Sequence, residues 1–231
     1  MRHIVCRTRE DAFDRAADFV VRTANAAIAD RGRFRIALSG GRTPDGLLER
    51  LVGQAPLDWS SIDVFWVDER CVPPSDDASN YARACERLLD RVPIPPANVH
   101  RIQADLPPRV AADAYEVMLR EVLGDDGRLD LVLLGIGADG HTASLFPRHQ
   151  ALHEDVRWVL PVHTGAVPPW RITMTLPLLN ASRVVLFLAT GAEKADAVRR
   201  AVVGEDLPAS RIAPVEGRVV WFVDRAAAAG L

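Results

Sequence analysis

Five short apolar runs, separated by longer amphipathic segments, constrain the fold of this chain more than any other feature. Each run is rich in β-branched, aromatic or leucine residues and is bounded by turn-forming residues, which is typical of buried strands. The predicted strands are residues 33–38, 62–67, 129–134, 183–189 and 219–223. The segments between them have apolar residues near helical spacing, and the predicted helices are residues 11–29, 45–51, 79–89, 110–123 and 193–203.

Buried strands that alternate with helices predict an α/β fold with a mostly parallel sheet covered by helices on both faces, a Rossmann-like three-layer core. Right-handed crossovers would place the loops after the strands along one edge of this sheet, where open α/β sheets bind their ligands. Because no linker or repeat divides the chain, we expect residues 1–231 to form a single α/β domain in which loops can build a small lid subdomain.

The composition argues against several classes of protein. The chain has 231 residues with 28 Lys and Arg against 31 Asp and Glu. Its formal charge of −3 does not indicate the basic surface that binds nucleic acid or an anionic membrane. No stretch approaches the roughly 18 apolar residues of a membrane span, and the N-terminus has no apolar signal core. Cys6, Cys71 and Cys85 form no Cys-x-x-Cys pair, which favours a reducing compartment. We expect a cytoplasmic protein, a monomer or a weak homo-oligomer.

A glycine-containing turn follows the first predicted strand and consists of Ser39, Gly40, Gly41, Arg42 and Thr43. The two glycines let backbone N–H groups approach a ligand, and Thr43 fits the N-cap of a helix with Pro44 at its first position. Since a helix N-terminus has partial positive charge and free N–H donors, the turn can hold a phosphate. An ordinary tight βα turn has the same pattern, so the motif alone leaves both interpretations open.

Charged residues also follow the second predicted strand. Arg70 can hold a phosphate through paired hydrogen bonds, and Asp68 can orient a base or a sugar hydroxyl. An ion pair between the two side chains, which would only stabilise the loop, is the alternative. Ser79 is predicted to be the N-cap of the helix that follows.

The loop after the third predicted strand contains a histidine among three glycines. Gly135, Gly137 and Gly140 surround His141, and so many glycines are costly in backbone entropy unless an unusual conformation or a close ligand requires them. The imidazole titrates near neutral pH, so His141 is the candidate general base. Asp139 is close enough in sequence to orient the ring, although it could instead cap the turn.

Two further cations are candidates for binding an anionic substrate. Lys194 is predicted in the first turn of a helix, where its positive charge interacts unfavourably with the helix dipole. A nearby phosphate would offset this unfavourable interaction. Arg171 precedes the fourth predicted strand and can be a ligand or a paired surface residue.

Other motifs carry no function in this interpretation. His149 and His153 have i, i+4 spacing, but no cysteine or carboxylate completes a zinc pattern, so no metal site is expected. The sequence contains no P-loop. The glycines of the His141 loop match a dinucleotide fingerprint, but a polar His141-Thr142 pair stands where that motif has an apolar helix start.

Together these segments resemble the 6-phosphogluconolactonases, which share an α/β fold with glucosamine-6-phosphate deaminases and ribose-5-phosphate isomerases. The matching segments span most of the chain, and DGHTASLFP is the most specific of them. The segments are SGGRTP, DERCVP with a following SN, GIGADGHTASLFP, RITMTLP, GAEK and VVWFVD. The resemblance implies hydrolysis of 6-phospho-D-glucono-1,5-lactone to 6-phospho-D-gluconate in the oxidative pentose phosphate pathway, with neither a metal nor an organic cofactor. It implies His141 as the general base and a phosphate and sugar site lined by Ser39, Gly40, Gly41, Arg70, Arg171 and Lys194.

Two other functions are compatible with this fold. A glucosamine-6-phosphate deaminase or sugar-phosphate isomerase would use Asp68 to abstract a proton from carbon. The deaminases, however, have a Phe-Asn-Glu-Pro run in place of Ser-Leu-Phe-Pro and tend to have Tyr at the position of Arg70. A sugar-phosphate sensor of this fold would need a DNA-binding helical module, for which this chain has no spare N-terminal length.

Overall fold

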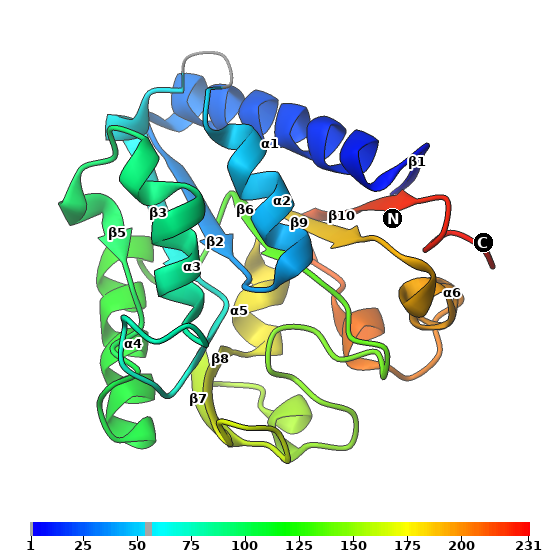
Figure 1. Ribbon diagram of the computed structural model, residues 1–231. Coiled ribbons are helices and arrows are strands. Elements are labelled where there is room, and N and C mark those ends of the chain that lie inside the picture. Colours follow the sequence, from blue (N-terminus) through cyan, green and yellow to red (C-terminus); the bar gives the residue numbers. More distant parts are fainter. Residues whose placement is uncertain (1, 54–56) are drawn as a thin grey trace.

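The computed structural model describes residues 2–53 and 57–231, and a seven-stranded sheet forms its centre (Figure 1). Its strands are β1 (Arg2–Cys6), β2 (Phe34–Leu38), β3 (Ile62–Trp66), β5 (Val99–His100), β6 (Leu131–Leu134), β9 (Val184–Ala189) and β10 (Arg218–Asp224). They lie in the order β1-β10-β9-β6-β2-β3-β5, and every neighbouring pair is parallel. The predicted α/β architecture is therefore confirmed, with β1 and β5 added at the two edges.

Within residues 2–53 and 57–231, six α-helices pack around the strands, and five of them match predicted helices. They are α1 (Arg9–Arg31), α2 (Arg42–Leu51), α3 (Asn80–Arg87), α4 (Pro108–Leu123), α5 (Leu176–Ala181) and α6 (Ala195–Val202). Six 3-10 turns are η1 (Trp59–Ser61), η2 (Leu89–Arg91), η3 (Pro96–Asn98), η4 (Gln150–His153), η5 (Ala192–Lys194) and η6 (Pro208–Arg211). The unpredicted helix α5 has six residues, too few to show helical periodicity in the sequence.

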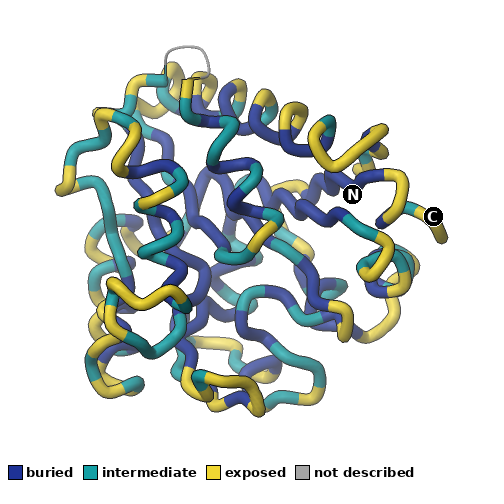
Figure 2. The backbone as a smooth tube through the Cα atoms, in the orientation of Figure 1, coloured by how far each residue is buried: buried dark blue, intermediate teal, exposed yellow. Residues whose placement is uncertain are grey.

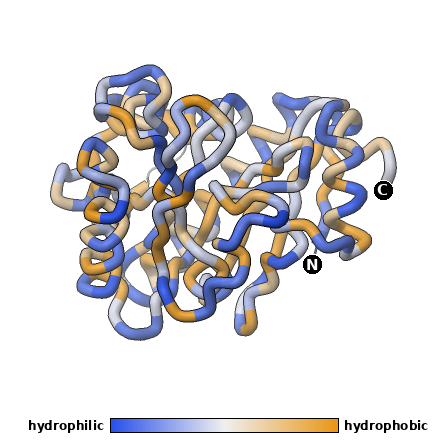
Figure 3. The backbone as a smooth tube through the Cα atoms, turned by 90° about the horizontal axis from the view of Figure 1, so that it is seen from below, coloured by the Kyte–Doolittle hydropathy of each residue, from blue (hydrophilic) through white to orange (hydrophobic). Residues whose placement is uncertain are grey.

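The core lies between the sheet and its helices. Strands β3, β6 and β9 are buried along their whole length, as near-continuous apolar runs require, and Figure 2 shows this as a dark interior below exposed helix surfaces. Figure 3 shows hydrophilic and hydrophobic residues alternating along the helical turns. Helix α1 packs on α2 and α2 packs on α3, so these helices form one continuous layer.

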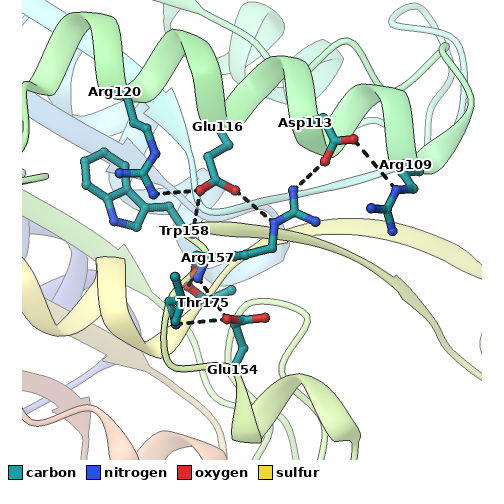
Figure 4. Close-up of polar contacts among 9 residues, drawn as sticks. Arg109, Asp113, Glu116, Arg120, Glu154, Arg157, Trp158 and Thr175 are labelled. Atoms are coloured by element: carbon teal, nitrogen blue, oxygen red, sulfur yellow. Dashed lines mark hydrogen bonds and ion pairs between the residues drawn. The ribbon is translucent and has the colours of Figure 1, made fainter.

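A second sheet of three antiparallel strands stands beside the main one. It consists of β4 (Asp68–Arg70), β8 (Trp170–Met174) and β7 (Val159–His163), in that order. Helix α4 packs against β7 and β8, and Glu116 on that helix accepts hydrogen bonds from Arg120, Arg157 and the backbone N–H of Trp158 (Figure 4). This polar network fixes the small sheet to the helix.

The strand order places a topological switch point between β2 and β6. From β2 the chain continues toward β3 and β5, whereas from β6 it continues toward β9 and β10. The loops after β2 and β6 therefore diverge in opposite directions and leave a crevice between them, which is where open α/β sheets bind ligands.

Two local predictions need comment. Thr43 is not an N-cap: α2 begins at Arg42, and Gly41 occupies the cap position with φ of 114°, a conformation that favours glycine. Ser79 is an N-cap as predicted, because its side chain accepts the backbone N–H of Ala82. Within the described residues, no His, Cys, Asp or Glu side chains form a group of three able to hold a metal ion, and no helix is long and apolar enough to cross a membrane.

Candidate active site

A cleft of about 340 Å³ lies at the carboxyl edge of the main sheet, at the switch point between β2 and β6. Its lining residues come from five separate parts of the sequence, namely the start of α1 and the segments at the ends of β2, β3, β6 and β9. Nine predicted site residues line it, namely Ser39, Gly40, Gly41, Arg42, Thr43, Asp68, Arg70, His141 and Lys194. The candidate base and the candidate phosphate-binding turn thus face one cavity.

Asp139 orients the imidazole of His141. Its Oδ1 lies 2.6 Å from Nδ1 of the ring and also accepts the backbone N–H of His141 at 3.1 Å. Burial opposes ionisation of Asp139, but this N–H and the neighbouring imidazole hold its pKa below the usual value. An ionised carboxylate can only accept, so a neutral imidazole in this position carries its proton on Nδ1 and its lone pair on Nε2. This is the tautomer that a general base needs.

Two neighbours fix the position of the His141 ring. A Cβ atom at Gly137 would lie 2.1 Å from Nδ1, so this position requires glycine for steric reasons. The ring of Phe146 lies against the imidazole with a centroid separation of 4.6 Å. The glycine-rich loop therefore allows close approach of the ring, as its composition indicates.

The opposite wall of the cleft is cationic and rich in free backbone donors. Helix α2 begins here without a side-chain cap, which leaves the backbone N–H groups of Arg42 and Thr43 available, since Pro44 has none and that of Asp45 donates to the oxygen of Gly41. Within the described part of the chain, neither Arg42 nor Lys194 forms an ion pair with a carboxylate. Arg70 donates to the backbone oxygen of Ala78 at 2.7 Å rather than to Asp68. This wall suits a phosphate dianion.

A buried polar cluster supports the floor of the cleft around Asp68. The Nδ2 of Asn80 donates to the backbone oxygen of Asp68 at 2.8 Å, and its amide fills the space beside Gly40. Behind it, burial raises the pKa of Glu69, whose carboxylate accepts the backbone N–H groups of Asn80 and Tyr81 at the start of α3. This carboxylate therefore stabilises the helix and does not face the substrate cleft.

The structure places two predicted residues outside the cleft lining. Asp139 acts on the cleft through His141. Arg171 is buried opposite Arg70 in the small sheet, and its guanidinium donates to the backbone oxygens of Pro168 and Trp170. Burial and the neighbouring charge of Arg70 lower the pKa of Arg171. It contributes positive charge near the cleft without lining it.

Several residues that line the cleft were not among those predicted from the sequence. The most informative are Arg9 and Phe13 from the start of α1, and Glu193 beside Lys194. Arg9 follows β1, so recognition of that edge strand would have placed it at the carboxyl edge with the other site loops. Glu193 had such a signal, because it belongs to the turn after a predicted strand.

The sequence matches the family model described as glucosamine-6-phosphate isomerases/6-phosphogluconolactonase over residues 7–221. The chain belongs to this family. A 6-phosphogluconolactonase of Nostoc is 41% identical, with 94% of this chain and 92% of the relative covered.

Solved structures of the family have the same architecture. The crystal structure of 6-phosphogluconolactonase from Thermotoga maritima has a TM-score of 0.88 at 31% identity, covering 97% of this chain and 99% of that one. A monomeric glucosamine-6-phosphate deaminase has a TM-score of 0.86 at 25% identity, with full coverage of both chains. The fold is thus common to the lactonase and deaminase branches, so the site has to distinguish them.

Proposed function

We propose that this protein is a lactonase that hydrolyses 6-phospho-D-glucono-1,5-lactone to 6-phospho-D-gluconate in the oxidative pentose phosphate pathway. One observation carries the proposal: an imidazole whose Nδ1 lies against the Asp139 carboxylate and a cationic, uncapped helix start face the same cleft. Its relatives are named 6-phosphogluconolactonases, and the substrate has the ester and the phosphate that these two walls would bind.

In this mechanism Nε2 of His141 takes a proton from water while the water oxygen attacks C1 of the lactone. The carbonyl oxygen becomes an oxyanion, and backbone N–H groups of the glycine-rich loops are the donors that would stabilise it. The bond between C1 and the ring oxygen then breaks, and the proton held by His141 passes to the departing ring oxygen. The products are the carboxylic acid, which ionises, and a free hydroxyl.

The phosphate would bind between the turn of residues 39–43 and Lys194. Because the phosphate is several bonds from C1, its binding energy serves to orient the ring for attack. A lactone is an activated ester, so general-base assistance of roughly a hundred- to ten-thousand-fold is a meaningful acceleration without a metal-bound water. We further propose that the protein works in the cytoplasm as a monomer or weak homo-oligomer.

The test is a lactonase assay in which formation of 6-phosphogluconate is followed above spontaneous hydrolysis. His141→Ala should lower kcat by roughly a hundred- to ten-thousand-fold and retain binding of the product. His153→Ala is a matched control, because this histidine is exposed in η4 outside the cleft. Full activity of His141→Ala would exclude His141 as the base.

Deamination of glucosamine 6-phosphate is the second candidate. It is favoured by the similarity to the monomeric deaminase and by the Asp68 carboxylate in the cleft, where that chemistry needs a base for a carbon-bound proton. Ammonia release from glucosamine 6-phosphate, measured beside lactone hydrolysis, distinguishes the two activities.

A further inference from the structure

The loop that carries His141 is joined to Asp68 through a buried hydroxyl group. The Oγ of Ser144 donates to Oδ2 of Asp68 at 2.6 Å, and both residues are at least nine-tenths buried. The carboxylate has a second, longer contact from Nδ2 of Asn80 at 3.4 Å. The serine is therefore the closest side-chain donor to this carboxylate in the described structure.

The backbone around Ser144 is strained and held in place from several sides. Residues Thr142 to Leu145 form a tight turn in which the N–H of Leu145 donates to the oxygen of Thr142 at 2.9 Å. Ala143 within this turn has φ of 49°, a left-handed conformation that is unfavourable for a residue with a Cβ. Such a conformation persists when its surroundings determine it.

Two contacts of the serine supply that constraint. Besides the hydroxyl bond to Asp68, its backbone N–H donates to Oγ1 of Thr173 at 3.2 Å. Thr173 is fully buried and is the partner of Asp68 across strands β4 and β8. The turn is thus fixed to the small sheet at Thr173 of β8 and Asp68 of β4, which are paired across the two strands.

From this geometry we infer that Ser144 is a positioning residue, which holds the Asp68 carboxylate toward the cleft and fixes it relative to His141. The inference rests on the proposed function, in which the substrate is a polyhydroxy lactone. The Asp68 side chain offers its free oxygen lone pairs to a sugar hydroxyl, and the bond from Ser144 prevents rotation of the carboxyl group away from that hydroxyl.

The experiment is a double-mutant cycle. Ser144→Ala should lower kcat/KM by roughly ten- to one-hundred-fold, since a hydrogen bond to a buried charged group is lost. Asp68→Asn should lower it at least as much, and the double variant should lose no more than Asp68→Asn alone. Ser182→Ala, which also removes a buried serine hydroxyl but lies outside the cleft lining, should keep wild-type kcat/KM.

Losses that multiply in the double variant, or wild-type kcat/KM for Ser144→Ala, would overturn the inference. If Ser144→Ala does not fold by circular dichroism, Ser144→Cys, which has the same side-chain shape with a slightly larger atom and a weaker donor, should give a partial, equally non-additive loss. A crystal structure of the folded variant gives a readout independent of turnover: Asp68 should change its side-chain rotamer, and an unchanged Asp68 contradicts the inference. Wild-type protein without lactonase activity would instead contradict the proposed function.

Discussion

Gly137→Ala tests the contact between the His141 loop and the imidazole with a single methyl group. The new Cβ would lie 2.1 Å from Nδ1 of His141 and 2.6 Å from Oδ1 of Asp139, whereas ordinary contacts begin at 3.4 Å. The ring or the carboxylate must therefore move by about 1 Å, and a displacement of this size at a reacting group costs roughly a hundredfold in rate. Since Gly137 does not have positive φ, alanine does not strain the backbone itself.

The assay is steady-state lactone hydrolysis at several substrate concentrations, corrected for the spontaneous reaction. We expect kcat to fall roughly a hundredfold and KM to change little, because the phosphate-binding turn is not displaced. Gly165→Ala is the matched control, since its Cβ meets no atom within 4 Å and the residue does not line the cleft. A kcat for Gly137→Ala equal to that of the control would refute the argument that this glycine makes room for the base.

Three further predictions concern binding and stability. Lys194→Ala should raise KM roughly tenfold or more with kcat nearly unchanged, and weaken competitive inhibition by inorganic phosphate. Although burial opposes it, hydrogen bonds from His100 and Arg33 lower the pKa of Asp63 to about 2. Asp63→Asn should therefore lower the free energy of unfolding in urea by about 2 kcal/mol at pH 7. The difference in this free energy between wild type and variant should be fully present above the unfolded pKa of about 4 and should disappear as the pH falls to about 2. Glu116→Gln should lower the same free energy by about 1–3 kcal/mol without changing kcat, and an unchanged urea midpoint would contradict a stabilising role for the α4 network.

The five central strands were predictable because burial on both faces leaves a near-continuous apolar run in the sequence. Strand β1 lacks that signal: it lies at the sheet edge, and its first residues are exposed. The small sheet was missed for a related reason. Strand β4 has three residues and β7 contains Pro161, so neither alternation nor a continuous apolar run marks these two strands. Strand β8 does alternate, with Trp170, Ile172 and Met174 separated by polar residues, and this signal was overlooked.

The residues of the candidate site likewise fall into those that were predicted from the sequence and those that were not. Residues that directly follow a central strand, such as Ser39 and His141, were predicted because the carboxyl edge of a parallel sheet brings them together. Arg9 was missed along with β1. Arg171 was predicted as a cleft residue, but its side-chain direction depends on the register between β4 and β8, which the sequence does not contain.

The position of strand β10 affects how the chain must fold as it is synthesised. Helix α1 packs on β10 and β2, and β1 pairs with β10, so two elements leave the ribosome long before the strand on which both of them pack. Until that strand emerges, the apolar side of α1 is open to chaperones and to misassembly. A ribosome stalled before residue 218 should therefore display a long, protease-sensitive helix on an otherwise partly formed sheet.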